Sequence, residues 1–176
     1  MALVIEDGTG VSGADSYGTR AGFITHVANY YGGTVADEDA SDVPMRSAFA
    51  YLNGLDWKGA KTLGRSQVGA FPRTDLEDCE GESIGVAEIP DELIAAQYDM
   101  AWAEKQSPGL LSPSGSIRDA LVSMEKVDVI AVEYDTSKIV PGQDVTSVRV
   151  EAAMRRIACF LVNGGRQVRQ TYAIAI

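Results

Sequence analysis

The sequence predicts a mainly α-helical domain, a helical bundle of about four helices with a projecting β-hairpin and a C-terminal strand. Three observations support this fold class. Apolar residues recur at helical spacing in four segments, β-branched residues alternate between 117 and 134, and a second alternating run occupies the last residues. The chain has 176 residues and is 45% hydrophobic, so residues 1–176 are expected to form a single domain with a packed core.

Residues 1–14 are expected to form an N-terminal arm, in which the short apolar run from Ala2 to Ile5 is a strand or packs on another surface. The glycine-rich stretch from Gly8 to Gly13 is expected to be flexible. Gly8, Gly10 and Gly13 match the spacing of dinucleotide sites, which need a strand before the pattern and a helix after it to bind pyrophosphate. No alternating strand–helix pattern follows, and Asp7 lies where a phosphate would approach. The arm is therefore preferred to a nucleotide site.

The first helix is expected to begin at the capping pair Asp15-Ser16 and to end at Gly32-Gly33. Its apolar face is expected to comprise Phe23, Val27, Tyr30 and Tyr31.

This helix carries His26, the only histidine of the chain. With no second histidine and no cysteine nearby, it is expected to be a surface or half-buried residue rather than a metal ligand or a base.

A second helix is expected from near Asp42 to Gly54, and a third, the most regular, from Pro90 to about Gln106. Apolar residues of the third helix form two stripes, so we expect burial on more than one side.

Between these helices, Pro72 favours an extended conformation at Phe71, whose ring is expected to anchor a long surface loop to the core.

The acidic run from Asp75 to Glu82 does not fit a calcium loop. Counted from Asp75, an EF-hand needs an oxygen ligand at position 5 and glutamate at position 12, where the chain has Cys79 and Val86. We therefore expect a solvated loop. Cys79 and Cys159 fit neither a metal spacing nor a disulfide framework, which is consistent with synthesis in a reducing cytoplasm.

Residues 117–135 are expected to form the hairpin, with its turn at Val127-Asp128. A final helix is expected from Asp144 or Thr146 to about Val162, with three arginines, 149, 155 and 156, facing away from its apolar side. These arginines serve either solubility or salt bridges to an acidic neighbour in an assembly.

The last segment, residues 166–176, alternates like a strand, with Val168, Tyr172, Ile174 and Ile176 on one face. It is expected either to add to the sheet of a neighbour as a docking tail or to fold back on its own hairpin as a third strand.

The net charge of −10 disfavours binding to phosphate backbones and to anionic membranes, since both depend on lysine and arginine. No apolar run is long enough to span a bilayer, and no secretion signal is recognisable. Known catalytic motifs are absent as well. We therefore expect no enzyme activity, no catalytic, cofactor-binding or metal-binding residues, and no cofactor.

An ordered set of short motifs resembles one protein family. The motifs are Glu6-Asp7-Gly8-Thr9-Gly10, Ala14-Asp15-Ser16-Tyr17, Ala50-Tyr51-Leu52-Asn53, Trp57-Lys58-Gly59, Ala70-Phe71-Pro72-Arg73, Ile89-Pro90, Glu125-Lys126-Val127 and Val132-Glu133-Tyr134. Together they resemble the head-to-tail adaptor proteins in the neck of tailed bacteriophages, a family often labelled DnaT-like single-stranded DNA-binding. Phe71 replaces a usual tryptophan, and Asp128 replaces a usual glycine.

The resemblance implies a structural virion protein, made in the host cytoplasm and located in the virion neck. It would form a homo-oligomeric ring of twelve subunits that binds the portal protein on one side and a downstream neck or tail protein on the other. DNA would pass through the lumen without specific binding. The candidate interface residues are Val127, Val129, Ile130, Val132, Tyr134, Arg149, Arg155, Arg156, Val168, Tyr172, Ile174 and Ile176.

The alternative is a single-stranded DNA-binding protein. That function needs a basic groove with aromatic stacking platforms, and the sequence offers only Arg149, Arg155 and Arg156 as a basic cluster.

Overall fold

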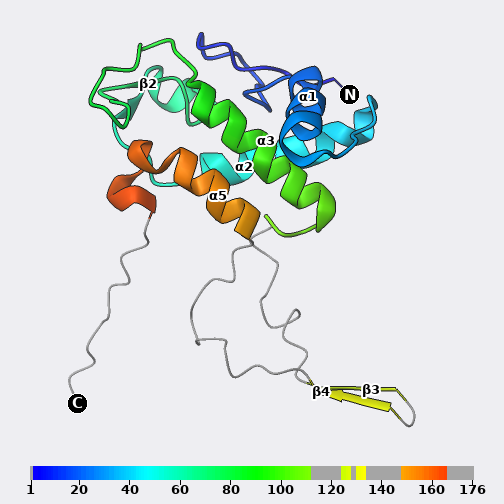
Figure 1. The fold of residues 1–176 in the computed structure, drawn as a ribbon. Coiled ribbons are helices and arrows are strands. Elements are labelled where there is room, and N and C mark those ends of the chain that lie inside the picture. Colours follow the sequence, from blue (N-terminus) through cyan, green and yellow to red (C-terminus); the bar gives the residue numbers. More distant parts are fainter. Residues whose placement is uncertain (1, 112–123, 128–129, 134–147, 166–176) are drawn as a thin grey trace, which may run out of the picture.

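The computed structural model describes residues 2–111, 124–127, 130–133 and 148–165. Its α-helices are α1 (Arg20–Tyr31), α2 (Asp42–Asn53), α3 (Asp91–Gln106) and α5 (Val148–Arg156), shown in Figure 1. Its strands are β1 (Ala60–Lys61), β2 (Arg73–Thr74), β3 (Met124–Val127) and β4 (Ile130–Glu133). Its short 3₁₀ turns are η1 (Asp39–Ser41), η2 (Gly64–Ser66), η3 (Ala158–Phe160) and η4 (Val162–Gly165). The mainly α-helical fold with a β-hairpin is confirmed, and the predicted strand at 166–176 lies outside the described residues.

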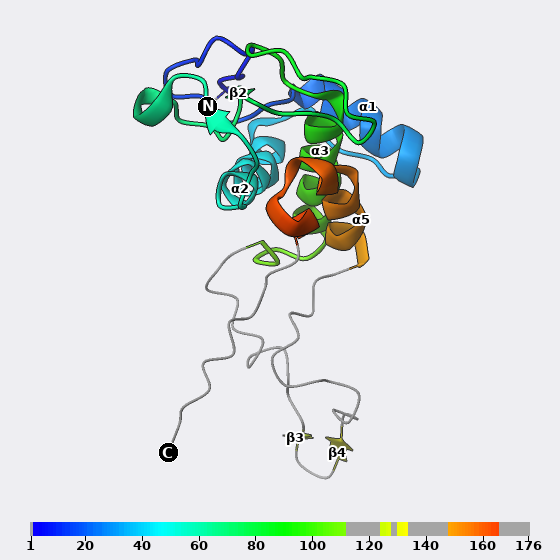
Figure 2. The same cartoon turned by 90° about the vertical axis from the view of Figure 1, so that its left-hand side faces the viewer.

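Helix α3 is the central element, and α1, α2 and α5 pack around it (Figure 1, Figure 2). Its buried residues are Leu93, Ala96, Gln97, Tyr98, Asp99, Met100, Ala101, Trp102 and Ala103. Burial on several sides confirms the two predicted stripes. Asp91 and Glu92 in the first turn and Lys105 in the last turn complement the helix dipole.

Helix α1 begins later than predicted. Thr19 is its N-cap, and its side chain accepts a hydrogen bond from the Gly22 amide at 3.0 Å. Asp15 instead accepts a hydrogen bond from the Val4 amide at 2.7 Å, and Ser16 forms a β-bridge with Ile5. The predicted cap at 15–16 is wrong because both residues hold the N-terminal segment.

Residues 2–14 are fixed to the body, so the expected flexibility of the glycine-rich stretch is wrong. The bridge between Ile5 and Ser16 fits the expectation that the apolar run before it is a strand or a packed arm. The buried carboxylate of Glu6 accepts hydrogen bonds from the Gly8 and Gly10 amides at 3.0 and 2.8 Å. Both glycines have positive φ, and a Cβ at Gly8 would lie 1.8 Å from the Ala87 carbonyl oxygen. The glycines therefore serve a tight turn in close contact with a second loop.

The loop from Gln67 to Thr74 is anchored as predicted, since the Phe71 ring is completely buried. It meets the ring of Trp57 edge-on, with the ring centroids 4.9 Å apart. Arg73 stabilises the same loop by donating hydrogen bonds to the carbonyl groups of Lys58, Gly59 and Ala70. Burial of Arg73 lowers the pKa of its guanidinium.

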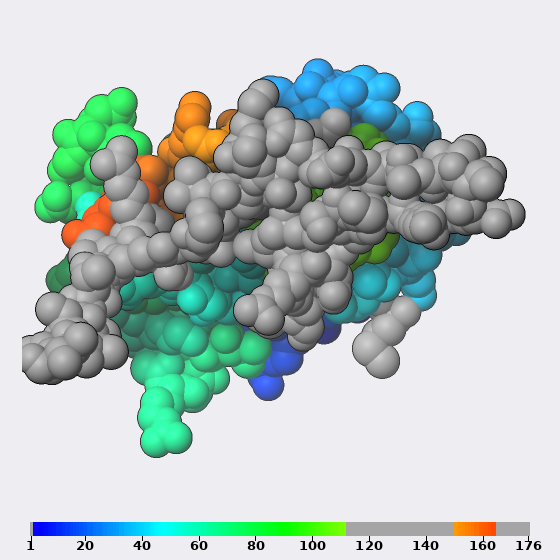
Figure 3. All heavy atoms as spheres, turned by 90° about the horizontal axis from the view of Figure 1, so that it is seen from below, coloured from blue at the N-terminus to red at the C-terminus, as the bar shows by residue number. Residues whose placement is uncertain are grey.

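A disulfide joins Cys79 and Cys159, whose Cα atoms are 5.2 Å apart and which are separated by 80 positions in sequence. The interpretation that these cysteines fit no disulfide is wrong. Figure 3 shows the reason, because the loop around Cys79 (green) lies at the surface beside the segment after α5 (orange to red). No local pattern in the sequence indicates that contact.

Helix α5 ends at Arg156, earlier than the predicted end near Val162. The chain after it is pulled into contact with the connector that follows α2: Leu161 bridges Trp57, and the Val162 amide donates to the Asp56 carbonyl at 2.9 Å. Pairing with this connector competes with continuation of the helix. The predicted start at Asp144 or Thr146 lies outside the described residues.

Strands β3 and β4 form an antiparallel pair, which confirms the hairpin at its centre. Val127, expected in the turn, is a strand residue that pairs with Ile130. The backbone register places Val127, Ile130 and Val132 on one face of the hairpin.

Candidate partner interface

The structure places only part of the predicted interface. Val127, Ile130 and Val132 belong to the paired strands, and Arg149, Arg155 and Arg156 belong to α5. Side chains are described only for Arg155 and Arg156 among these six. Val129, Tyr134, Val168, Tyr172, Ile174 and Ile176 lie outside the described residues.

Asp99 of α3 is the centre of a polar network that joins three helices. Its carboxylate is 1% exposed and lies 2.6 Å from His26 Nε2, and it accepts hydrogen bonds from the Tyr31 hydroxyl at 2.7 Å and from Arg156 Nε at 2.7 Å. A buried carboxylate is stable only when charged or polar partners compensate its lost hydration, and these three groups do so. The network therefore fixes α1 and α5 on α3.

His26 is 8% exposed, so its prediction as a surface or half-buried residue is wrong. The face of α1 that carries His26 turns toward α3. The partner of His26 there, Asp99, is 73 positions away in sequence.

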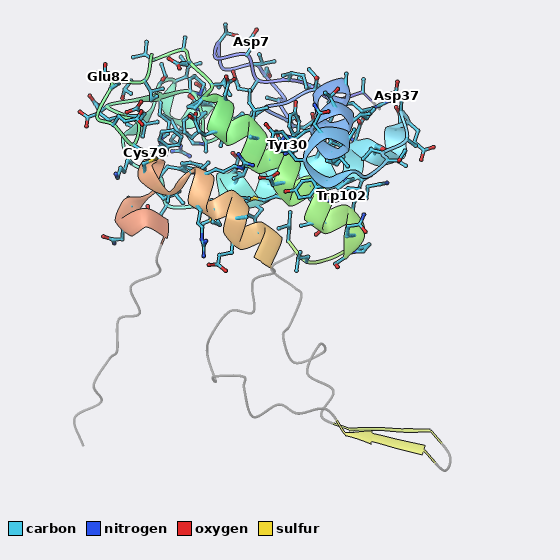
Figure 4. The ribbon with its side chains drawn as sticks, viewed as in Figure 1. Asp7, Tyr30, Asp37, Cys79, Glu82 and Trp102 are labelled. Atoms are coloured by element: carbon cyan, nitrogen blue, oxygen red, sulfur yellow. A yellow bond between two sulfur atoms is a disulfide. The ribbon has the colours of Figure 1, made fainter. Side chains whose placement is uncertain are left out.

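Tyr30 is 66% exposed, although the sequence placed it on the buried face of α1. Its ring lies on the His26 ring with centroids 4.5 Å apart, and the Arg156 guanidinium carbon lies 5.9 Å from its centroid. Figure 4 shows Tyr30 and Trp102 in the same half of the body. The spacing of four between Phe23, Val27 and Tyr31 is the signal that could have placed Tyr31 inward and Tyr30 at the edge.

The described arginines are largely engaged within the chain. Arg20 binds Asp37, Asp39 and Asp42, and hydrogen bonds to Asp42 and Asp39 raise the pKa of its guanidinium.

Other arginines follow the same pattern. Arg46 binds Asp15 at 2.5 Å, and exposed Arg155 binds Glu151 one turn away at 2.6 Å. The sequence analysis offered solubility or salt bridges to a neighbouring chain as the role of Arg155 and Arg156. The structure adds a third role, because both arginines bind carboxylates of their own chain.

Within the described residues there is no group of three or more His, Cys, Asp or Glu side chains that could hold a metal ion. No helix in that part is both long and apolar enough to cross a membrane.

These observations define a small mainly α-helical domain with 25 acidic and 15 basic residues. A family model described as "Putative DnaT-like ssDNA binding protein" matches residues 1–173, and the chain belongs to this family. No curated protein matches the chain, and no solved structure does. The description of this family names the activity that the sequence offered as the alternative function.

Proposed function

We propose that the chain is a structural head-to-tail adaptor that forms a ring in the neck of a tailed-bacteriophage virion. Each ring would contain twelve copies, contact the portal protein above and a neck or tail protein below, and let DNA pass without specific binding or catalysis. The observation that carries the proposal is the engagement of Arg20, Arg46 and Arg155 with carboxylates of their own chain, within a net charge of −10.

Such a charge distribution suits a conduit. Binding of single-stranded DNA depends on cations that are free to displace counterions from phosphates. Arginines held by carboxylates supply little of that free energy, so DNA would slide past this surface rather than adhere to it.

The hairpin supplies a second argument for assembly. Among the described residues, strands β3 and β4 pair with each other as a two-stranded sheet, and a sheet of this size is marginally stable alone in water. Addition of a strand from a neighbouring copy or from another neck protein would satisfy an open edge.

Single-stranded DNA binding is the second candidate, supported by the family description and by the exposed Tyr30 beside Arg156. An aromatic ring next to a guanidinium could stack on a base and contact a phosphate.

One experiment separates the two candidates. The purified full chain is titrated onto a fluorescent oligonucleotide of about 30 nucleotides at low and at physiological salt, and its assembly is followed by native mass spectrometry and electron microscopy. The adaptor predicts rings and a dissociation constant weaker than about 10 μM at physiological salt. Sub-micromolar binding that weakens steeply with salt would overturn it in favour of the DNA-binding function.

A further inference from the structure

Tyr30 and Arg156, together the Tyr30 anchor, have the properties of an interface hot spot. The tyrosine ring is largely exposed, yet it is held from below by the His26 ring and flanked by the guanidinium. Exposed aromatic residues beside arginine dominate the binding free energy of many protein interfaces.

The anchor is held rigid from inside the molecule. Asp99 lies within hydrogen-bond distance of both His26 and Arg156, so one buried carboxylate positions the two groups that flank Tyr30. Side chains ordered before binding lose less conformational entropy when a partner arrives.

Arg156 also indicates the chemistry of the partner. It donates Nε to Asp99, while its two Nη groups have no hydrogen-bond partner within the described part of the chain, and its side chain is 40% exposed. A guanidinium with free Nη groups is suited to a carboxylate or a phosphate, and in a ring of copies of this chain the anions at hand are the carboxylates of the neighbouring copy. The partner should therefore be an acidic segment.

Such a segment exists in the chain itself. The acidic loop, residues 75–88, contains no lysine or arginine, and its exposed acidic residues include Glu77, Glu80 and Glu82. It also exposes the apolar side chain of Val86.

The loop has a defined shape. The Asp78 carboxylate accepts hydrogen bonds from the Glu80 and Glu82 amides at 2.8 and 2.9 Å, and Cys79 is bonded to Cys159. It would therefore dock as a shaped surface, with little ordering on binding.

The anchor and the loop lie on different parts of the surface. Figure 4 shows Cys79 and Glu82 at one end of the body and Tyr30 near its middle, and Figure 3 shows the acidic loop and α1 on opposite sides of α5. Two different, complementary surfaces on one subunit give a heterologous contact, which closes into a ring when the rotation permits.

We propose that the acidic loop of one copy docks on the Tyr30 anchor of the next copy, and that this contact repeats around the ring. The inference rests on the proposed adaptor function and specifies one of its subunit contacts.

Charge exchange provides the first test. Tyr30→Glu should repel the loop, and Glu80→Lys/Glu82→Lys should weaken its attraction to Arg156. Each is expected to raise the dissociation constant for self-association at least about tenfold, measured by sedimentation equilibrium. Combining them in one chain should recover most of the affinity, since the carboxylate introduced at position 30 then faces the introduced lysines.

The matched control is Glu38→Lys, which reverses an exposed acidic residue outside the loop and should leave self-association unchanged. All substituted side chains are exposed, so the unfolding temperature should stay within about 2 °C of the wild-type value.

A second measurement locates the contact directly. A photoreactive p-benzoylphenylalanine replaces exposed Asn29, next to the anchor, and the variant is mixed with ¹⁵N-labelled wild-type chain. Cross-linked peptides should join position 29 of one copy to residues 75–88 of the labelled copy. Cross-links to other segments, cross-links only within a chain, or a chain that stays monomeric would overturn the inference.

The outcomes distinguish this inference from the proposed function. Wild-type-like rings from the charge-reversed variants would overturn the contact and leave the adaptor function standing. Loss of tight single-stranded DNA binding in Tyr30→Glu, with no change in self-association, would overturn both.

Discussion

Gln97 uses every polar atom of its amide although it is completely buried in α3. Its Oε1 accepts hydrogen bonds from the Tyr17 and Gly18 amides, and its Nε2 donates to Ser16 Oγ and to the Met45 carbonyl, all at 2.9–3.0 Å. One side chain thus ties the segment before α1 and helix α2 to α3.

Gln97→Leu should destabilise the fold strongly, because the new side chain leaves these groups unpaired in the interior. We expect a loss of roughly 2–4 kcal/mol in the free energy of unfolding, measured by urea denaturation. Gln106→Leu, at the exposed end of the same helix, is the control and should change it by less than about 0.5 kcal/mol. Equal effects of both substitutions would contradict the assigned role of Gln97.

Two buried tyrosines predict an alkaline limit to stability. Burial raises the pKa of Tyr17 and of Tyr98 above the ordinary value of 10.0. The neutral phenols contribute stability that is fully present below pH 10 and is lost as the pH rises toward the raised values, because only the unfolded chain then releases the protons.

The free energy of unfolding should therefore fall above about pH 10, by at most about 1.4 kcal/mol per pH unit for each such tyrosine. Tyr98→Phe should make this slope shallower in urea titrations at pH 9, 10 and 11. An unchanged slope in that variant would show that Tyr98 does not contribute.

At the scale of elements, the Cys79–Cys159 disulfide fastens the acidic loop to the turn after α5. A cross-link over 80 positions restricts the unfolded chain strongly, so it should contribute about 2–4 kcal/mol to stability. Reduction is expected to lower the unfolding midpoint without loss of helix signal in circular dichroism.

Cys79→Ser/Cys159→Ser is the control for this prediction. It should unfold at the midpoint of the reduced wild type and should not respond to reductant. A wild-type midpoint that is insensitive to reductant would be evidence against a stabilising disulfide.

Elements whose signals are local could be predicted from the sequence. The sequence of α3 contains the signals for its start and its end as well as its apolar stripes. Helix α2 begins at Asp42 and ends before Gly54, as expected. The start of α1 and the end of α5 were misplaced, because contacts of Ser16 with Ile5 and of Leu161 with Trp57 decide them. Such contacts join residues distant in sequence and leave no periodic pattern.

The candidate site also combines features that the local sequence indicates with features that depend on contacts between distant residues. Charge alone singled out Arg155 and Arg156, but the buried carboxylate that holds Arg156 is 57 positions away. Tyr30 was missed because an aromatic residue on an amphipathic helix is ordinarily assigned to the core. Only the packing of α1 on α3 reveals that Tyr31 takes the inner position and Tyr30 the outer one.

On the scale of the whole molecule, the described residues include a continuous hydrophobic core, and residues 166–176 lie outside the described part of the chain. Its buried hydrophobic residues run from Ala14 to Leu161, and the turn η4 ends at Gly165. Residues 166–176 remain predicted to be a docking tail, with the fold-back on the hairpin as the alternative.

Deletion of residues 166–176 tests this prediction. The truncated chain should keep its helical content and an unfolding free energy within about 1 kcal/mol of wild type, because the described core is intact. It should fail to form rings, since burial of four apolar side chains at roughly 1.5–3 kcal/mol each would be lost from the subunit contact. Loss of folding in the truncated monomer would favour the fold-back alternative, and normal rings would contradict both interpretations of the tail.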